Sequence, residues 1–395
     1  MINYEDFIND KIKQVKPSGI RKFFDIAVEM DNVISLSIGE PDFQTPWHIR
    51  EAGITTLEKG KTWYTPNRGF AELRSEIAKY YKRRFNVSYN SDTDVIVTVG
   101  GSEAIDLVFR TLVNEGDEVL IPEPAFVCYT PLTYMAGGTP VIIETKAENN
   151  FRLTREELLG AITEKTKLLV LPFPNNPTGA IMEREDLEAI ADIIIENDLM
   201  VISDEIYGEL TYGGKNHVSV AEIDGLKERT VVVSGFSKAY AMTGWRLGYA
   251  LGPEPVISEI TKLHQYGIMS APTTAQYAAI EALRNGDEDV LEMRRDYDIR
   301  RRLIVGKLNE IGLTCFEPLG AFYTFPCIKS TGLTSDEFAT RLVKEKRVAV
   351  VPGTAFGDSG EGFVRISYAQ SLKNIKKALK RIEEFVEELK NESKG

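Results

Sequence analysis

Apolar positions recur in two patterns through the middle of the chain. Runs that are apolar almost throughout predict strands at residues 94–99, 118–121, 140–144, 167–171, 200–203, 231–233 and 247–251. Between them lie amphipathic stretches such as 183–197, where Leu187, Ile190 and Ile194 recur at helical spacing. Strands without polar positions are buried on both faces. The alternation therefore favours an α/β fold, with a mainly parallel sheet covered by helices on both sides.

The pattern changes after residue 285. Long charged helices are followed by strand-like runs at 347–351 and 363–366, and then by a helix from Ser371 onward. This change predicts a second, α+β domain. We expect residues 1–45 to form an N-terminal arm and part of a small domain, residues 46–285 a large domain, and residues 286–395 the small C-terminal domain.

Composition narrows the classes of function. The chain has 395 residues, 43% of them hydrophobic, and a formal net charge of -12. A negative field of this kind disfavours nucleic acid and anionic membrane lipid as partners. The three cysteines have no paired spacing, which favours a reducing cytoplasm over a disulfide framework. The three histidines lie far apart in the sequence, so no metal site is expected.

Residues that could bind a ligand or take part in catalysis follow four of the predicted strands. Ligands of open α/β sheets bind outside the carboxyl ends of the strands. We therefore expect these residues to converge on one edge of the sheet: Gly100 to Ser102, Asn176, Asp204 and Lys238.

The segment Gly100-Gly101-Ser102 joins a strand to a helix N-terminus. Free N–H groups and the positive end of the helix dipole would suit a phosphate there. Alone, the segment fits a tight turn with Ser102 as the helix cap equally well. It lacks the third glycine of a dinucleotide fingerprint, and the chain contains no GxxxxGK[ST], which excludes NAD and P-loop nucleotides.

The most specific motif is residues 235–248, which read GFSKAYAMTGWRLG. This segment resembles the lysine-attachment signature of class I/II aminotransferases, the fold-type-I enzymes that use pyridoxal 5'-phosphate. The resemblance implies that Lys238 bonds to the cofactor aldehyde and that Arg246 grips its phosphate. It also implies a large domain built on a mainly parallel seven-stranded sheet between helices, with a small α+β domain beside it.

Other segments resemble the same family in the same order along nearly the whole chain. On the cofactor side, the resemblance implies that Phe126 stacks on the ring, that Asn176 and Tyr207 bond its ring oxygen, and that Asp204 holds the pyridine nitrogen. Gly101 and Ser102 would meet the phosphate, with Tyr64 reaching it from the neighbouring subunit. Several members carry serine where this chain has Gly235, and Ser237 would take over part of that role. The catalytic residues implied are Lys238, Asp204 and Tyr207.

On the substrate side, the resemblance implies that Arg365 clamps the α-carboxylate, with Gly39 and Asn176 beside it. The wall formed by Ile20 and Ile38 would be apolar. Residues 18–22, and the chain generally, most resemble archaeal-type aromatic aminotransferases of broad specificity. One aspartate-specific branch places a lysine where this chain has Ser102.

The function implied is the transfer of an amino group from an aromatic or other hydrophobic amino acid to a 2-oxo acid such as 2-oxoglutarate. Aspartate, alanine or N-acetyl-diaminopimelate aminotransferase activity stays open, as does a C–S lyase that uses the same lysine and aspartate. A homodimer follows if Tyr64 serves the partner's cofactor. Residues 38–43, which read IGEPDF, resemble the family's N-terminal GxPDF element. A regulator with an aminotransferase-like domain would need a DNA-binding module before this element, and too few residues precede it.

Overall fold

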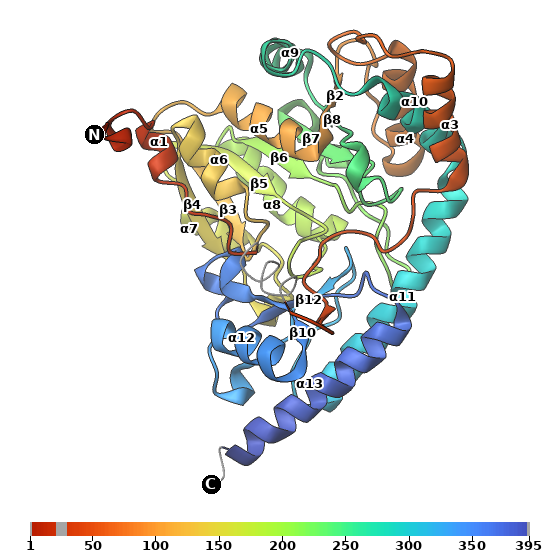
Figure 1. The fold of residues 1–395 in the computed structure, drawn as a ribbon. Helices are drawn as coiled ribbons and strands as arrows, with labels where there is room; N and C mark the ends of the chain where they lie inside the picture. The colour runs from red at the N-terminus through yellow and green to blue at the C-terminus, as the bar shows by residue number, and fades with distance from the viewer. Residues whose placement is uncertain (1, 21–29, 393–395) are drawn as a thin grey trace.

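The computed structural model describes residues 2–20 and 30–392, and a seven-stranded sheet forms its centre (Figure 1). The strand order is β2-β8-β7-β6-β5-β3-β4. Only β8 runs against its neighbours β2 and β7, so the prediction of a mainly parallel α/β sheet is confirmed. The strands are β2 (Val95–Thr98), β3 (Glu118–Glu123), β4 (Thr139–Glu144), β5 (Thr166–Leu171), β6 (Met200–Asp204), β7 (Thr230–Gly235) and β8 (Gly248–Leu251).

Alternate residues of these strands enter separate cores on the two faces of the sheet. In β7, Val231 and Val233 pack with α5, α6 and α9, whereas Val232 packs with α4 and α10 on the opposite face. Because both faces are buried, the strands need apolar residues at nearly every position. The helices on the sheet are α4 (Ala71–Phe85), α5 (Gly100–Leu112), α6 (Tyr129–Ala136), α7 (Arg155–Ala161), α8 (Arg184–Glu196), α9 (Glu254–Gly267) and α10 (Thr273–Asn285). Near the N-terminus lie α1 (Asp10–Lys13), against α6, and α3 (Trp47–Glu58), against α10.

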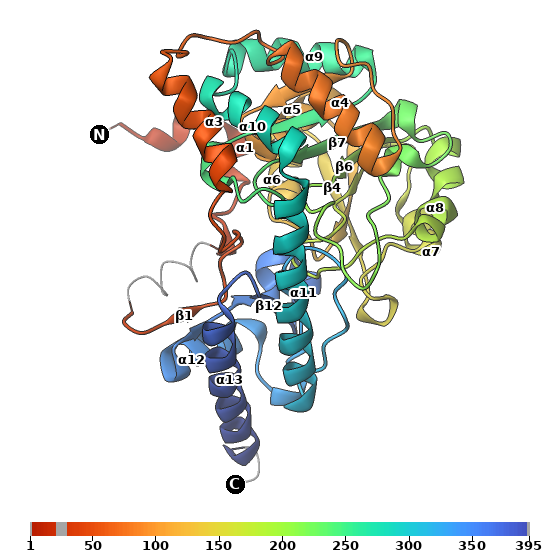
Figure 2. The ribbon, with the colours of Figure 1, turned by 90° about the vertical axis from the view of Figure 1, so that its right-hand side faces the viewer.

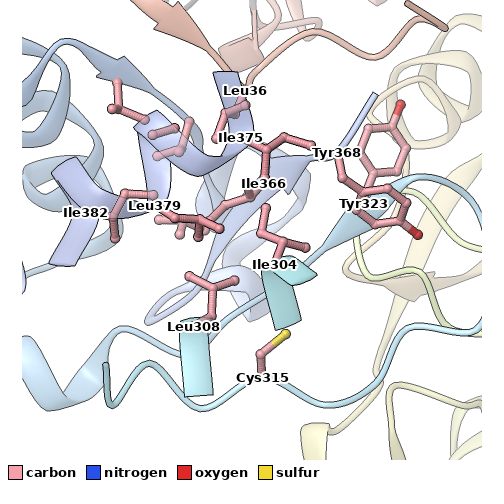
Figure 3. Packing of buried hydrophobic residues seen from close by; sticks show 14 of the residues in the cluster. Leu36, Ile304, Leu308, Cys315, Tyr323, Ile366, Tyr368, Ile375, Leu379 and Ile382 are labelled. Carbon is pink, nitrogen blue, oxygen red and sulfur yellow. The ribbon is translucent and has the colours of Figure 1, made fainter. Parts of the chain in front are cut away.

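The C-terminal part forms a second body of helices and short strands. Helices α11 (Asp287–Glu310) and α13 (Leu372–Glu392) run side by side, with α12 (Ser335–Lys346) next to them (Figures 1 and 2). Their core joins Ile304 and Leu308 of α11 to Ile375, Leu379 and Ile382 of α13 (Figure 3). The strands are β1 (Ile34–Ser35) paired with β10 (Val348–Ala349), and the sheet of β11 (Val351–Pro352), β12 (Val364–Ser367) and β9 (Tyr323–Thr324).

Two local expectations differ from the structure. The helix after β2 begins at Gly100 rather than Ser102, with Val99 at the N-cap and no side chain capping it. The strand-like run 347–351 is divided between β10 and β11, because Val348 pairs with Ile34 whereas Val351 pairs with Arg365. The division of the chain into domains at residues 45 and 285 stays a prediction. None of the helices in the described part of the chain is long and apolar enough to cross a membrane.

Candidate active site

A cavity of about 390 Å³ lies where the carboxyl ends of the large sheet meet β9 and β12. Its size is typical of a site for a small ligand. The convergence predicted from the strand ends is thus found in three dimensions. Most of the predicted site residues line this cavity, and Tyr64, Ile38 and Gly100 do not. Those that line it are Ile20, Gly39, Gly101, Ser102, Phe126, Asn176, Asp204, Tyr207, Ser237, Lys238, Arg246 and Arg365.

Lys238 enters the cavity from the turn that follows β7. Its Nζ donates a hydrogen bond of 2.6 Å to the carbonyl of Gly39, which anchors the N-terminal segment to the large sheet. Burial, aided by the positive charge of Arg365, lowers the pKa of Lys238 to about 8, although Glu40 acts in the opposite direction. A neutral amine is the form that attacks a carbonyl carbon, so a lowered pKa makes Lys238 a better nucleophile.

Asp204 is the last residue of β6 and is buried. Its Oδ2 accepts a hydrogen bond of 2.7 Å from the hydroxyl of Tyr129, and its Oδ1 accepts one of 3.2 Å from the amide of Ile206. Burial raises the pKa of Asp204, whereas these hydrogen bonds act to lower it. A cationic ligand group beside this carboxylate would lower the pKa further and gain a charge-assisted bond.

The N-terminus of α5 lines one end of the cavity, and this end suits a phosphate. No side chain caps this helix, so its first N–H groups are available to a ligand anion. Gly100 has a φ of 77°, and a Cβ there would lie 2.8 Å from Nη2 of Arg246, so the guanidinium lies directly against the turn. Arg246 is held by a hydrogen bond of 3.0 Å to the carbonyl of Thr243. Ser237 lines the same cavity.

Arg365 is only 2% exposed and lies in the middle of β12. Its Nη1 donates to Oδ1 of Asn176 at 2.9 Å and its Nη2 to the carbonyl of Ser37 at 2.5 Å. The guanidinium lies over the rings of Tyr323 and Phe356, at 4.5 Å and 4.8 Å. Within residues 2–20 and 30–392, no carboxylate forms an ion pair with Arg365 and its Nε has no hydrogen-bond partner. Such a buried charge is costly unless an anion joins it.

The remaining predicted residues differ in how they meet the cavity. Phe126 lies edge-on to Tyr129, with ring centroids 6.3 Å apart. The hydroxyl of Tyr207 is 2.8 Å from that of Tyr323. Tyr64 lies outside the cavity and is 76% exposed. Ile20 lines the cavity but Ile38 does not, so the expected apolar wall is only partly formed by these two residues.

Two tyrosines that contact the predicted residues were not anticipated from the sequence. Tyr129 begins α6 three residues after Phe126, and this short separation in sequence could have indicated that both lie at one site. Tyr323 lies in a two-residue strand, and no local pattern marks it. Glu40 and Thr243 also line the cavity, and none of the described residues forms a cluster of three or more metal-ligating side chains.

Comparison with known proteins identifies the family. The family described as aminotransferase class I and II matches residues 31–382. The chain belongs to the class I and II aminotransferases. Aromatic-amino-acid aminotransferase 2 of Thermococcus litoralis is 46% identical, and an aspartate aminotransferase of Pyrococcus abyssi is 48% identical, each over 97% of this chain and 99% of the relative. The crystal structure of an aromatic aminotransferase from Pyrococcus horikoshii superposes with a TM-score of 0.89, at 46% identity over 93% of this chain and 99% of that one.

The class I and II aminotransferases depend on pyridoxal 5'-phosphate, and this chain is accordingly a transaminase that uses that cofactor. The cavity fits the group. It offers a buried amine for the aldehyde, a buried carboxylate for the ring nitrogen, and an uncapped helix start with an adjacent guanidinium for the phosphate. When bound, the cofactor supplies an aldehyde that bonds to amines and a ring that accepts the electron pair released at the substrate α-carbon.

Proposed function

We propose that this aminotransferase takes its amino group from an aromatic or other hydrophobic amino acid and passes it to a 2-oxo acid such as 2-oxoglutarate. The observation that carries the proposal is the environment of Arg365. A fully buried guanidinium with an unpaired Nε and no acidic partner among the described residues is prepared for a carboxylate. The α-carboxylate common to amino acids and 2-oxo acids fits this site, with Gly39 and Asn176 beside it.

We propose the cofactor-binding roles that the family resemblance implies, for residues that line the same cavity. Asp204 would hold the pyridine nitrogen and Tyr207 with Asn176 the ring oxygen, while Phe126 would cover one face of the ring. For the phosphate, the donors at hand are the amides and hydroxyls near the start of α5 and the turn after β7, together with one guanidinium: Gly101, Ser102, Ser237 and Arg246. These donors come from separate elements and surround one volume, which supports a single cofactor position.

Lys238 would act twice. Its amine would hold the cofactor, and once free it would take the proton from the substrate α-carbon and deliver it to the cofactor carbon that bears the amino group. A pKa of about 8 leaves a useful fraction of neutral amine near neutral pH. Arg365 fixes the α-carboxylate and thereby orients the bond to be broken.

The cavity lining favours a hydrophobic side chain. Ile20 and Ile105 contribute apolar surface, and Ser102 stands where one aspartate-specific branch has a lysine. Apart from Lys238, Arg246 and Arg365, the described lining carries no cation that would meet a second carboxylate. Arg21 and Lys22 lie outside the described residues. Because one relative named above is an aromatic and another an aspartate aminotransferase, aspartate is the chief competing donor.

We also propose a homodimer with shared active sites, located in the cytoplasm. Tyr64 is highly exposed and lies outside its own chain's cavity, which suits a residue that reaches the partner's cofactor. Trp63 beside it and Tyr266, Ile268 and Met269 are also exposed. The carbonyl of Trp63 accepts a hydrogen bond from Thr273, and Asn67 donates one to the carbonyl of Met269. Residues 63–67 and 266–273 therefore form one exposed apolar surface.

The test is to record the visible absorption of the purified protein and then add single amino acids without an acceptor. Loss of the yellow band with phenylalanine or tyrosine is expected, and it would identify the donor class. A response to aspartate or alanine alone would contradict the proposed donor while leaving the aminotransferase assignment intact. Release of pyruvate and ammonia without a 2-oxo acid would identify a C–S lyase instead.

A further inference from the structure

Tyr323 contacts the groups on both sides of the cavity. It is buried at 1% exposure and lies in β9, whose residue Thr324 pairs with Ile366 of β12. The neighbouring strand β12 carries Arg365. Tyr323 is thus held by backbone pairing rather than by a loop, and its ring and hydroxyl have fixed positions.

The hydroxyl of Tyr323 meets that of Tyr207 at 2.8 Å. A phenol has one proton, so in such a pair one hydroxyl donates and the other accepts. If Tyr207 donates its proton to the ring oxygen of the cofactor, it can only accept from Tyr323. Either hydroxyl can donate in the structure as it stands, and a ring oxygen that accepts from Tyr207 would make Tyr323 the donor of the pair.

The ring of Tyr323 lies under the guanidinium of Arg365, with the cation 4.5 Å from the ring centroid. Because Arg365 is buried, this contact stabilises the charge and fixes the plane of the guanidinium. The hydroxyl also lies close to Gly39, because a Cβ on that glycine would come within 2.6 Å of it. The carbonyl of Gly39 in turn accepts the hydrogen bond from Lys238.

We propose that Tyr323 is a positioning residue that acts in two separable ways. Its hydroxyl orients the Tyr207 proton toward the cofactor ring oxygen, and its ring orients Arg365 for the substrate carboxylate. The inference rests on the roles proposed above for Tyr207 and Arg365. Tyr323 itself need not touch the reacting atoms.

Two substitutions separate the two actions. Tyr323→Phe removes the hydroxyl and keeps the ring under Arg365, whereas Tyr323→Leu removes both. A matched control is Tyr368→Phe, since Tyr368 is buried in the same hydrophobic core and donates to the carbonyl of Ala321 at 3.2 Å, but does not line the cavity. A purely structural role predicts the same effect for both tyrosine-to-phenylalanine variants.

The deciding measurement is the pH titration of the visible absorption of the bound cofactor in each purified holoenzyme. In Tyr323→Phe the midpoint should rise by about half a unit to one unit, because a less well oriented Tyr207 stabilises the ring-oxygen anion less. Tyr368→Phe should titrate like the parent protein. If the midpoint of Tyr323→Phe equals that of the parent protein, the hydroxyl of Tyr323 does not orient the Tyr207 proton.

The effect of the Tyr323 ring on Arg365 is tested by comparing the change in KM with the change in kcat. Tyr323→Phe should leave the KM for the amino donor within about twofold, whereas Tyr323→Leu should raise it about tenfold. Equal KM changes in both variants overturn the role of the ring. The outcome is distinct from failure of the proposed function. A parent protein that shows no cofactor band, or no half-reaction with any amino acid, contradicts the proposed function itself.

Discussion

The hydroxyl of Tyr129 donates a 2.7 Å hydrogen bond to Oδ2 of Asp204, across 75 residues of sequence. Tyr129 begins α6 and Asp204 ends β6, so the bond joins a helix on one face of the sheet to the carboxyl edge. It opposes the effect of burial, which raises the pKa of Asp204. The carboxylate is thereby kept available for a cationic group.

Tyr129→Phe should raise the pKa of Asp204 further, because the ionised form loses a donor. Cofactor binding to the unloaded protein should then require a higher pH, with the midpoint moved up by about one unit. Fluorescence titration with pyridoxal phosphate at several pH values measures this shift. Tyr134→Phe in the same helix is the control. An equal loss of affinity at every pH would show that the hydrogen bond does not act through ionisation.

Lys238→Ala should reduce turnover by at least about a thousandfold, because no other amine of the described lining can replace it. Lys262→Ala, which alters an exposed lysine paired with Glu259, should not change turnover. Near-parental activity of Lys238→Ala would exclude the assignment.

The amine of Lys238 should also titrate in an unusual range in the unloaded protein. Burial and Arg365 lower its pKa to about 8, from the value of 10.5 for an ordinary lysine. Reductive methylation with labelled formaldehyde, followed by NMR over a pH series, measures this pKa. A midpoint at the ordinary value would show that the amine is solvated before the cofactor binds.

Arg365→Lys should raise the KM for the amino donor about ten- to a hundredfold, because a point charge cannot reproduce a two-pronged contact with a carboxylate. The change in kcat should be smaller. Steady-state kinetics at saturating cofactor measure both. Arg341→Lys, at a partly buried arginine outside the cavity that pairs with Glu345 and Glu392, is the matched control. An unchanged KM for Arg365→Lys would contradict the role.

Local patterns were sufficient for much of the fold and the site. The strands were predicted because both faces are buried, and their ends differ from the expectation by only one or two residues, as at β2 and β6. Lys238 and Arg246 share one short segment, so a motif could identify both. The division of residues 347–351 between two sheets could not be predicted, because it depends on Ile34 and Arg365, partners distant in sequence. Tyr323 was missed for the same reason, since it matters only through Tyr207 and Arg365.

Shared active sites predict complementation between two damaged subunits. If Tyr64 serves the partner's cofactor, a mixed dimer of Lys238→Ala and Tyr64→Ala chains contains one complete site, with the lysine from one chain and the tyrosine from the other. Random mixing of equal amounts should then restore about a quarter of the parental sites, for a two-fold symmetric dimer. Activity at limiting cofactor, measured after mild unfolding and joint refolding, tests this. Activity equal to the sum of the separately refolded variants would place Tyr64 outside the partner's site.

The raised pKa of Glu123 predicts that the stability of the protein depends on pH. It ends β3 against Gly357, where a Cβ would come within 1.9 Å of its Oε2, and the adjacent amide of Ala125 donates to the carbonyl of Phe356 at 3.1 Å. Burial, with the negative charge of Asp358, raises the pKa of Glu123 from 4.5 to about 7.

Between these two pKa values the folded chain holds a proton on Glu123 that the unfolded chain has released. This contribution to the free energy of unfolding therefore falls as pH rises through the interval, by at most about 3 kcal/mol, and by less where water reaches the carboxyl. Glu123→Gln keeps the shape and removes the titration, so its stability should decline less over the same interval. Urea unfolding at a series of pH values compares the parent, Glu123→Gln and Glu148→Gln, an exposed control. If the free energies of unfolding of the parent and of Glu123→Gln change in parallel with pH, Glu123 is not the group that takes up the proton. The contact between β3 and residues 356–358 then does not depend on the protonation of Glu123.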